Sequence, residues 1–286
     1  MVELHTLETE DGCLLDAAYW PAAKVASGRA DGCVFTHGAT GNAFSPFQRD
    51  MGEALSAAGI ATVSINTRGH DIVSRIVRRD GVPARGGTAF EDLDDAAFDL
   101  HAGAAFLRDR GASRLAIGGH SLGAVKSIFV QATRPIEGAT CLVAVSPPRI
   151  AWEVQTVGPM AKRFGETRAE ALRLIAEGRG DELIDATVPI PSRFGAAQYE
   201  KKYGPESRYD VARCFDSVGV PVFFLFGTTE LSTMHQIGAS GAAAGAWTKA
   251  HPDSSNFVLI EGADHSYTGL RDRATAAVVD WLTSPT

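Results

Sequence analysis

Residues 119–123 read Gly-His-Ser-Leu-Gly and constrain the fold of this 286-residue chain more than any other segment. An apolar run (115–118) precedes them and a helix-prone run (124–133) follows, so the sequence predicts a sharp turn from a strand into a helix. A G-x-S-x-G segment in this setting projects its serine from the backbone at the end of a sheet. Glycines flank the serine because side chains beside so tight a turn would clash.

Strand-like and helix-like segments alternate along most of the chain. The later strand-like runs are continuously apolar, which is typical of strands covered by helices on both faces. The sequence therefore predicts an α/β fold with a mostly parallel, eight-stranded sheet flanked by helices, and an antiparallel hairpin at its start. The expected strands are 3–7, 14–20, 32–35, 61–65, 114–117, 139–145, 220–226 and 256–260, and the expected helices are 46–58, 89–110, 122–133 and 271–283.

Residues 148–210 depart from this alternation. They contain few continuous apolar runs, with helix-like pieces at 168–177 and 181–184 among glycines and prolines. A segment of about 60 residues is too long for a plain connection between two elements of a compact domain. We therefore expect residues 148–210 to form a unit of their own.

Two lone polar residues, Glu230 and His265, each follow one of the later strand-like runs. The order serine, acid, histidine is that of the α/β-hydrolases, and the chain resembles that superfamily along nearly its whole length. The resemblance implies an α/β-hydrolase core at 1–147 and 211–286, with a small helical cap (148–210) inserted after strand 6. The matching motifs are His37-Gly38-Ala39-Thr40-Gly41-Asn42, Arg68-Gly69-His70, the Ser121 turn, Gly227-Thr228-Thr229-Glu230 and Gly262-Ala263-Asp264-His265.

The chemistry of these residue types supports a catalytic triad. A serine hydroxyl is a weak nucleophile at neutral pH and needs an adjacent base, which a neutral histidine can supply. We therefore expect Ser121 to be the nucleophile, His265 the base and Glu230 the acid that orients the base. The family more often carries Asp at the position of Glu230, so other carboxylates are alternatives; these are Asp264, Asp253 and Asp216, whereas residue 146, where some relatives place their acid, is a serine.

Backbone N–H groups of Ala39 and Leu122 are the expected oxyanion hole, since Leu122 begins a helix whose first N–H groups have no helical partner. We expect His37 to brace the loop rather than to act as a base. Large apolar side chains could line the substrate pocket, although the aromatic ones in 148–210 could equally be the core of that segment. The candidates for substrate binding are Phe44, Trp152, Met160 and Met234.

The leading functional hypothesis is a serine hydrolase that cleaves a carboxylic ester, lactone or thioester of a small molecule through an acyl-enzyme. Carbon–carbon bond hydrolysis and acyl transfer use the same triad order and stay open, as does a non-catalytic ligand-binding scaffold. Segments 66–71, 119–126 and 203–210 also resemble a subgroup that includes fungal siderophore-ester hydrolases, a resemblance that does not identify a substrate.

The composition restricts the partners. A net charge of −7 argues against nucleic acid or an anionic membrane as the main partner. The four cysteines are dispersed, as in proteins of a reducing compartment, so we expect buried thiols and a cytoplasmic location. No histidine pair has metal-ligand spacing, and we expect neither a metal nor another cofactor. A homodimer stays open, as does contact of an acidic substrate group with Arg75, Arg78, Arg79 or Arg85.

Overall fold

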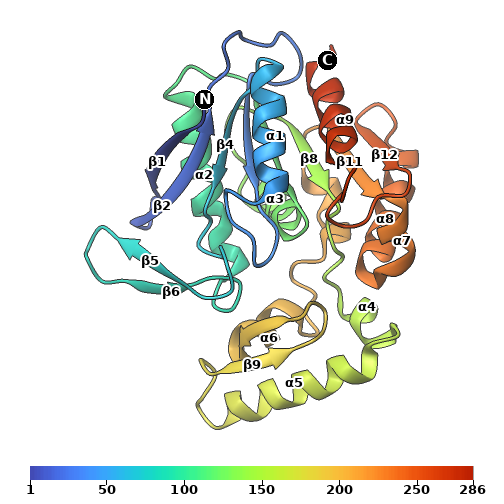
Figure 1. Ribbon diagram of the computed structural model, residues 1–286. Helices are drawn as coiled ribbons and strands as arrows, with labels where there is room; N and C mark the ends of the chain where they lie inside the picture. The colour runs from blue at the N-terminus through green and yellow to red at the C-terminus, as the bar shows by residue number, and fades with distance from the viewer. Residues whose placement is uncertain (286) are drawn as a thin grey trace.

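The computed structural model describes residues 1–285 and contains one large sheet covered by helices (Figure 1). Within these residues the sheet has ten strands in the order β12-β11-β8-β7-β3-β4-β2-β5-β6, with β1 beside β2. The pairs from β4 to β12 are parallel, and β1 and β2 form the expected antiparallel hairpin. The strands are β1 (Glu3–Glu8), β2 (Cys13–Trp20), β3 (Gly32–Thr36), β4 (Ala61–Ile65), β5 (Ser74–Arg78), β6 (Ala84–Gly86), β7 (Leu115–His120), β8 (Ala139–Val145), β11 (Val222–Gly227) and β12 (Ser255–Ile260).

Alternate side chains of the central strands point to opposite faces of the sheet and pack into two separate hydrophobic layers. Cys33 and Phe35 of β3 pack with helices α1 (Pro46–Ala57) and α9 (Arg271–Thr283), whereas Val34 packs on the other face. That second face is covered by α2 (Ala96–Arg108), α3 (Leu122–Thr133) and α8 (His235–Ala250). A parallel strand that is buried on both faces has no polar side, which explains the continuous apolar runs in the sequence.

The eight strands predicted from the sequence are all present, and two more extend the sheet. β5 and β6 arise from the basic stretch 69–88 and form an antiparallel hairpin that continues from β2. Val77 and Val82 of this hairpin are exposed, so it carries little of the apolar burial that marks the other strands. Arg85 forms an ion pair with Asp181 and Arg79 with Glu8, which engages both guanidinium groups in structural contacts.

The segment 148–210 lies beside the sheet as a small unit (Figure 1). The helix expected at 168–177 belongs to a longer one, but the helix expected at 181–184 is wrong, because 183–186 is a strand with alternate buried residues. Its buried aromatic rings, among them Phe164, Phe194 and Tyr199, pack on one another. The elements are α4 (Trp152–Val157), α5 (Ala161–Ala176), the antiparallel pair β9 (Leu183–Ala186) and β10 (Ser192–Gly195), and α6 (Ala196–Tyr203).

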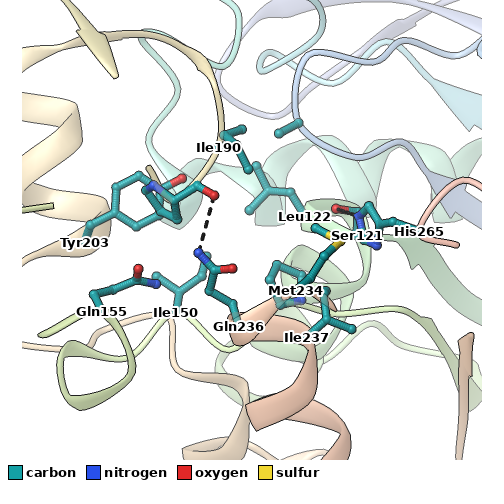
Figure 2. Close-up of a pocket in the computed structure, with 13 residues that line it drawn as sticks. Ser121, Leu122, Ile150, Gln155, Ile190, Tyr203, Met234, Gln236, Ile237 and His265 are labelled. Carbon is teal, nitrogen blue, oxygen red and sulfur yellow. Dashed lines mark hydrogen bonds between the residues drawn. The ribbon is translucent and has the colours of Figure 1, made fainter. Parts of the chain in front are cut away.

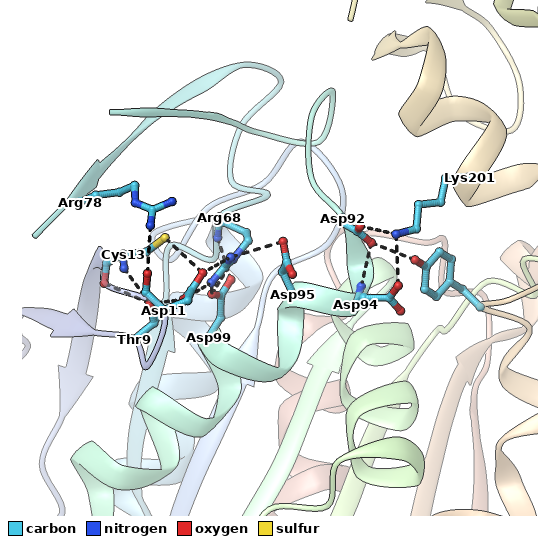
Figure 3. Close-up of polar contacts among 11 residues, drawn as sticks. Thr9, Asp11, Cys13, Arg68, Arg78, Asp92, Asp94, Asp95, Asp99 and Lys201 are labelled. Atoms are coloured by element: carbon cyan, nitrogen blue, oxygen red, sulfur yellow. Dashed lines mark hydrogen bonds and ion pairs between the residues drawn. The ribbon is translucent and has the colours of Figure 1, made fainter. Parts of the chain in front are cut away.

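Arg68 of the Arg-Gly-His motif has a structural role (Figure 3). Its guanidinium group donates to Asp99 of α2 at 2.9 Å and to Asp11 of the β1–β2 turn at 2.9 and 3.0 Å. Asp99 is fully buried, and burial raises the pKa of its carboxyl group against the opposing effect of Arg68. The ion pairs tie the loop after β4 to the hairpin and to α2.

The four cysteines are free and buried, as predicted. No helix within residues 1–285 is both long enough and apolar enough to cross a membrane.

Candidate active site

Ser121 occupies the turn between β7 and α3 with φ 56° and ψ −124°, a conformation that residues other than glycine rarely adopt. Its flanking glycines make the turn possible by close packing. A Cβ atom on Gly119 would lie 2.5 Å from Gly123, and one on Gly123 would lie 2.3 Å from the carbonyl oxygen of Thr36. The strained serine is therefore held in a tight turn from β7 into α3, whose first turn packs on the end of β3.

The structure brings the three candidate triad residues into one hydrogen-bonded chain. His265 Nε2 lies 2.9 Å from Ser121 Oγ, and His265 Nδ1 lies 2.6 Å from Glu230 Oε2. Because a carboxylate can only accept, the Nδ1 atom carries the proton of the neutral ring, which leaves the lone pair of Nε2 facing the serine hydroxyl. This is the arrangement in which a histidine can take the proton of an attacking serine.

Glu230 lies in α7 (Thr228–Thr233), directly after β11, and its side chain is fully buried. Its Oε1 atom accepts hydrogen bonds from the backbone N–H of Gly227 at 2.7 Å and from the Ser146 hydroxyl at 2.5 Å. These donors hold Oε1, so Oε2 is the oxygen presented to His265. The longer side chain of Glu, compared with the usual Asp, is accommodated because it folds back onto the start of its own helix.

Two of the alternative acids, Asp264 and Asp216, bond to groups other than His265. Asp264 accepts from the backbone N–H groups of Ser266 and Thr268, and these contacts, chiefly that of Thr268, lower the pKa of its carboxyl group. Asp216 accepts from the indole of Trp247. Neither carboxylate contacts His265 in the described part of the chain.

Three residues around the triad were missed as functional candidates. His120 Nε2 donates to the backbone carbonyl of His265 at 2.7 Å, and the two rings lie 4.9 Å apart, so His120 positions the His265 loop. Burial, followed by the nearby His265, lowers the pKa of His120 to about 3, which keeps its ring neutral. Ser146 and Tyr267 form a hydrogen-bonded pair at 2.8 Å beside Glu230. The only sequence signal for Ser146 was its place after the strand where relatives carry an acid.

Ala39 and Leu122, the expected oxyanion-hole residues, both line the pocket that contains Ser121 and His265. Leu122 is the first residue of α3, and within residues 1–285 neither N–H has a hydrogen-bond partner. Gly38 approaches closely, since a Cβ atom there would lie 2.9 Å from Ser121 Cβ. Two free N–H groups beside an exposed hydroxyl can stabilise an oxyanion formed at that point.

A chain of hydrogen bonds fixes the orientation of the Ala39 N–H. Lys126 Nζ donates to Thr67 Oγ1 at 3.1 Å, the Thr67 hydroxyl lies 3.0 Å from His37 Nε2, and His37 Nδ1 lies 2.8 Å from the carbonyl oxygen of Gly38. Every donor in this series finds an acceptor when the His37 ring is neutral and carries its proton on Nδ1. The lone pair of Nε2 then accepts from the Thr67 hydroxyl, and Nδ1–H donates to the Gly38 carbonyl. Burial, followed by the charge of Lys126, lowers the pKa of His37 to about 3. The Gly38 carbonyl and the Ala39 N–H belong to one planar peptide unit and point in opposite directions. The hydrogen bond to the Gly38 carbonyl therefore fixes the direction of the Ala39 N–H.

This series of hydrogen bonds begins at Lys126, which belongs to a buried group of three charged side chains. Glu91 Oε2 lies 2.6 Å from Lys126 Nζ and its Oε1 lies 3.0 Å from Lys202 Nζ, with all three side chains almost fully buried. Gly69 leaves room for this carboxylate, since a Cβ atom there would lie 1.7 Å from Glu91 Oε2. Lys126 belongs to α3 and Lys202 to α6, so the ion group connects the inserted segment to the loop of the candidate oxyanion hole.

A narrow, largely apolar pocket opens beside Ser121 (Figure 2) and encloses about 460 Å³, part of it open to solvent. Of the four residues predicted to bind substrate, Met234 lines it. Phe44 and Met160 are about half exposed and do not line it, and Trp152 packs on Phe164 and Arg168 instead. The lining residues are Ala39, Ser121, Leu122, Pro148, Ile150, Gln155, Pro189, Ile190, Tyr203, Met234, Gln236, Ile237 and His265.

A second, more polar pocket adjoins the same residues. It shares Ala39, Ser121 and His265 with the apolar pocket. Its other lining residues include Thr40, Ser45 and Arg271. Ser121 and His265 therefore line both an apolar and a more polar pocket.

Comparison with known proteins agrees with this architecture. Residues 33–281 match the model of the alpha/beta hydrolase family, and the chain belongs to that family. No curated protein sequence matches it significantly.

Solved structures show the same fold at low sequence identity. The chain is similar to Est1E from Butyrivibrio proteoclasticus with bound ferulic acid (17% identity, 97% of each chain covered, TM-score 0.68). It is also similar to the esterase Pf2001 of Pyrococcus furiosus (17% identity, 99% of this chain and 90% of the other, TM-score 0.61). A third similar structure is the alpha/beta hydrolase GrgF from Penicillium sp. sh18 (13% identity, 99% and 98% covered, TM-score 0.69). The family supports a hydrolase, and these neighbours show the same fold.

Proposed function

We propose that this protein is a serine hydrolase that cleaves carboxylic esters of small molecules through an acyl-enzyme. The observation that carries the proposal is the continuous chain from Glu230 through His265 to Ser121, with contacts of 2.6 and 2.9 Å. The free N–H groups of Ala39 and Leu122 beside the serine add the oxyanion hole that acyl transfer requires.

The proposed reaction proceeds in two halves. Ser121 Oγ attacks the ester carbonyl carbon while its proton passes to His265 Nε2, and the carbonyl oxygen becomes an oxyanion that accepts from Ala39 and Leu122. The tetrahedral intermediate collapses, the bond to the alcohol oxygen breaks, and His265 returns the proton to that oxygen. Water then attacks the acyl-enzyme in the same way, with His265 again the base, and releases the acid.

The two pockets suggest how an ester would lie. Leu122, a proposed oxyanion donor, lines only the apolar pocket, and Ser266, which follows His265, lines only the polar one. We therefore place the acyl group in the apolar pocket and the leaving alcohol in the polar pocket, near the proton carried by His265. The inserted segment supplies Ile150, Gln155, Pro189, Ile190 and Tyr203 to the apolar pocket, so we propose that it acts as the cap.

Hydrolysis of p-nitrophenyl esters from acetate to octanoate tests this proposal, with Ser121→Ala as the inactive reference. We expect turnover by the wild type, with a preference for short to medium acyl groups because the pocket is narrow. No turnover of any ester above the Ser121→Ala background would contradict the proposal. The ester of ferulic acid belongs in the same panel because a structural neighbour binds that acid.

A further inference from the structure

The far end of the apolar pocket contains polar groups that no interaction within the protein explains. Gln155, on α4, is 6% exposed, and its Nε2 atom is buried without a hydrogen-bond partner in residues 1–285. Several other buried side-chain atoms also lack a hydrogen-bond partner, but in the described residues Gln155 is the one among them that lines the pocket beside Ser121. Leaving such a donor unpaired is destabilising, so a ligand atom that accepts from it strengthens binding.

Two further polar groups face the same end. Gln236 donates its Nε2 hydrogen to the backbone carbonyl of Pro189 at 3.3 Å, which leaves its Oε1 atom as an acceptor for the pocket. Tyr203 also lines the pocket, and burial raises the pKa of its hydroxyl well above the ordinary value, so the group is a neutral O–H. Figure 2 shows Gln155, Tyr203 and Gln236 on one side of the pocket and Ser121 and His265 on the other.

The stretch between the two ends is apolar. Leu122, Ile150, Ile190, Met234 and Ile237 line it, and these side chains offer no hydrogen bond. A ligand that fills the pocket must therefore be apolar along its middle and polar at its tip. A donor (Gln155 Nε2) and an acceptor (Gln236 Oε1) at the same end together match a hydroxyl group, which both accepts and donates.

We propose that Gln155 and Gln236 form a subsite for a hydroxyl group at the end of the acyl chain remote from the ester, so that the preferred substrates are esters of hydroxylated acids with an apolar spacer. This inference rests on the proposed ester hydrolysis and adds the chemical class of the acyl group. Gln155 is a specificity-determining residue here, and it takes no part in the bond-breaking steps.

Matched ester pairs test the subsite. Methyl 3-(4-hydroxyphenyl)propanoate is compared with methyl 3-phenylpropanoate, and methyl 6-hydroxyhexanoate with methyl hexanoate, by kcat/KM. We expect the wild type to prefer the hydroxylated member of at least one pair about 10-fold, the effect of one or two well-placed hydrogen bonds. Gln155→Leu should bring that ratio close to one by lowering turnover of the hydroxylated ester alone.

Gln198→Leu is the matched control. Gln198 also belongs to the inserted segment and has an unpartnered buried amide oxygen, but it does not line the pocket. This variant should retain the wild-type ratio. Thermal unfolding adds a readout without substrate, because removing the unpaired amide in Gln155→Leu should leave the melting temperature unchanged or raise it.

The outcomes separate the two proposals. Equal turnover of both members of each pair by the wild type, or an unchanged ratio in Gln155→Leu, overturns the hydroxyl subsite and leaves ester hydrolysis in place. If neither these esters nor p-nitrophenyl esters are hydrolysed, the proposed function fails and the subsite fails with it.

Discussion

The hydroxyl of Ser146 lies 2.5 Å from Glu230 Oε1, at the point of the sheet where some relatives place their catalytic acid. Ser146 itself receives a hydrogen bond from the Tyr267 hydroxyl at 2.8 Å, and Gly227 donates to the same carboxylate oxygen. A buried carboxylate requires such donors because it has lost its hydration. Ser146, directly after β8, therefore supports an acid that lies after the neighbouring strand β11.

Replacing Ser146 tests this support. Ser146→Ala removes one hydrogen bond from a buried carboxylate, and such bonds to charged groups contribute about 1.5–3 kcal/mol. We expect kcat/KM for a p-nitrophenyl ester to fall by about 10-fold or more. Ser240→Ala is the control, since Ser240 is also buried but has no hydrogen-bond partner in residues 1–285 and lies on α8. Equal activity of the two variants would show that Ser146 does not support the acid.

The identity of the acid is tested by Glu230→Gln and Asp264→Asn. Gly227 and Ser146 donate to one side of the Glu230 carboxylate, so the amide NH₂ of the glutamine variant would face His265 Nδ1. His265 would then carry its proton on Nε2 and could not accept from Ser121. The corresponding Asp→Asn change in a serine protease lowers kcat about 10⁴-fold, and we expect a loss of similar order. Asp264→Asn should retain activity within about 2-fold, as surface substitutions usually have small effects; a larger loss for Asp264→Asn than for Glu230→Gln would reverse the assignment.

The chain of donors behind the oxyanion hole predicts an effect at Thr67, which touches no substrate. Thr67→Val breaks the link between Lys126 and His37 and releases the peptide that carries the Ala39 N–H. Loss of an oxyanion donor costs about 100- to 1000-fold, so misorientation should lower kcat by at least about 10-fold with little change in KM. Thr62→Val is a matched control, because Thr62 is equally buried on β4 but bonds only to the carbonyl of Ile60. An effect on KM alone would contradict the positioning role.

Replacing Glu91 should reduce the stability of the fold more than replacing Lys202, its partner in the buried ion group. Glu91→Gln leaves Lys126 and Lys202 buried without a counter-charge, and breaking a buried pair in this way costs about 3–5 kcal/mol. Lys202→Met leaves the Lys126–Glu91 pair intact and should cost less. Urea unfolding measured on both variants checks the order, and a greater loss of stability for Lys202→Met would contradict this account of the group.

The sequence was most informative where burial on both faces left a clear pattern. The later, parallel strands and the Ser121 turn follow from local rules, because a parallel strand covered on both faces has no polar side and a tight turn requires glycine. The hairpin β5–β6 has no such pattern because its side chains are largely exposed. Helix α8 was also missed, because its alanines and glycines give almost no contrast between a buried and an exposed face.

The reacting side chains of the candidate site could be predicted because few residue types can act as nucleophile, base or acid. Ser121, His265 and Glu230 could be chosen from their places after strands, and the structure brings them within hydrogen-bond distance. The supporting contacts were not predictable, because Ser146, His120 and Thr67 act through tertiary contacts with distant parts of the chain. The pocket depends on how 148–210 packs, which explains why Trp152 and Met160 do not line it, whereas Gln155 does.

The central claim is that Ser121 is an activated nucleophile, and labelling with a fluorophosphonate tests it most directly. The purified protein and its Ser121→Ala variant are each treated with the probe and analysed by intact mass and peptide mapping. The account predicts one adduct on the wild type, located at Ser121, and none on the variant. An unlabelled wild type, or equal labelling of both proteins, would contradict it.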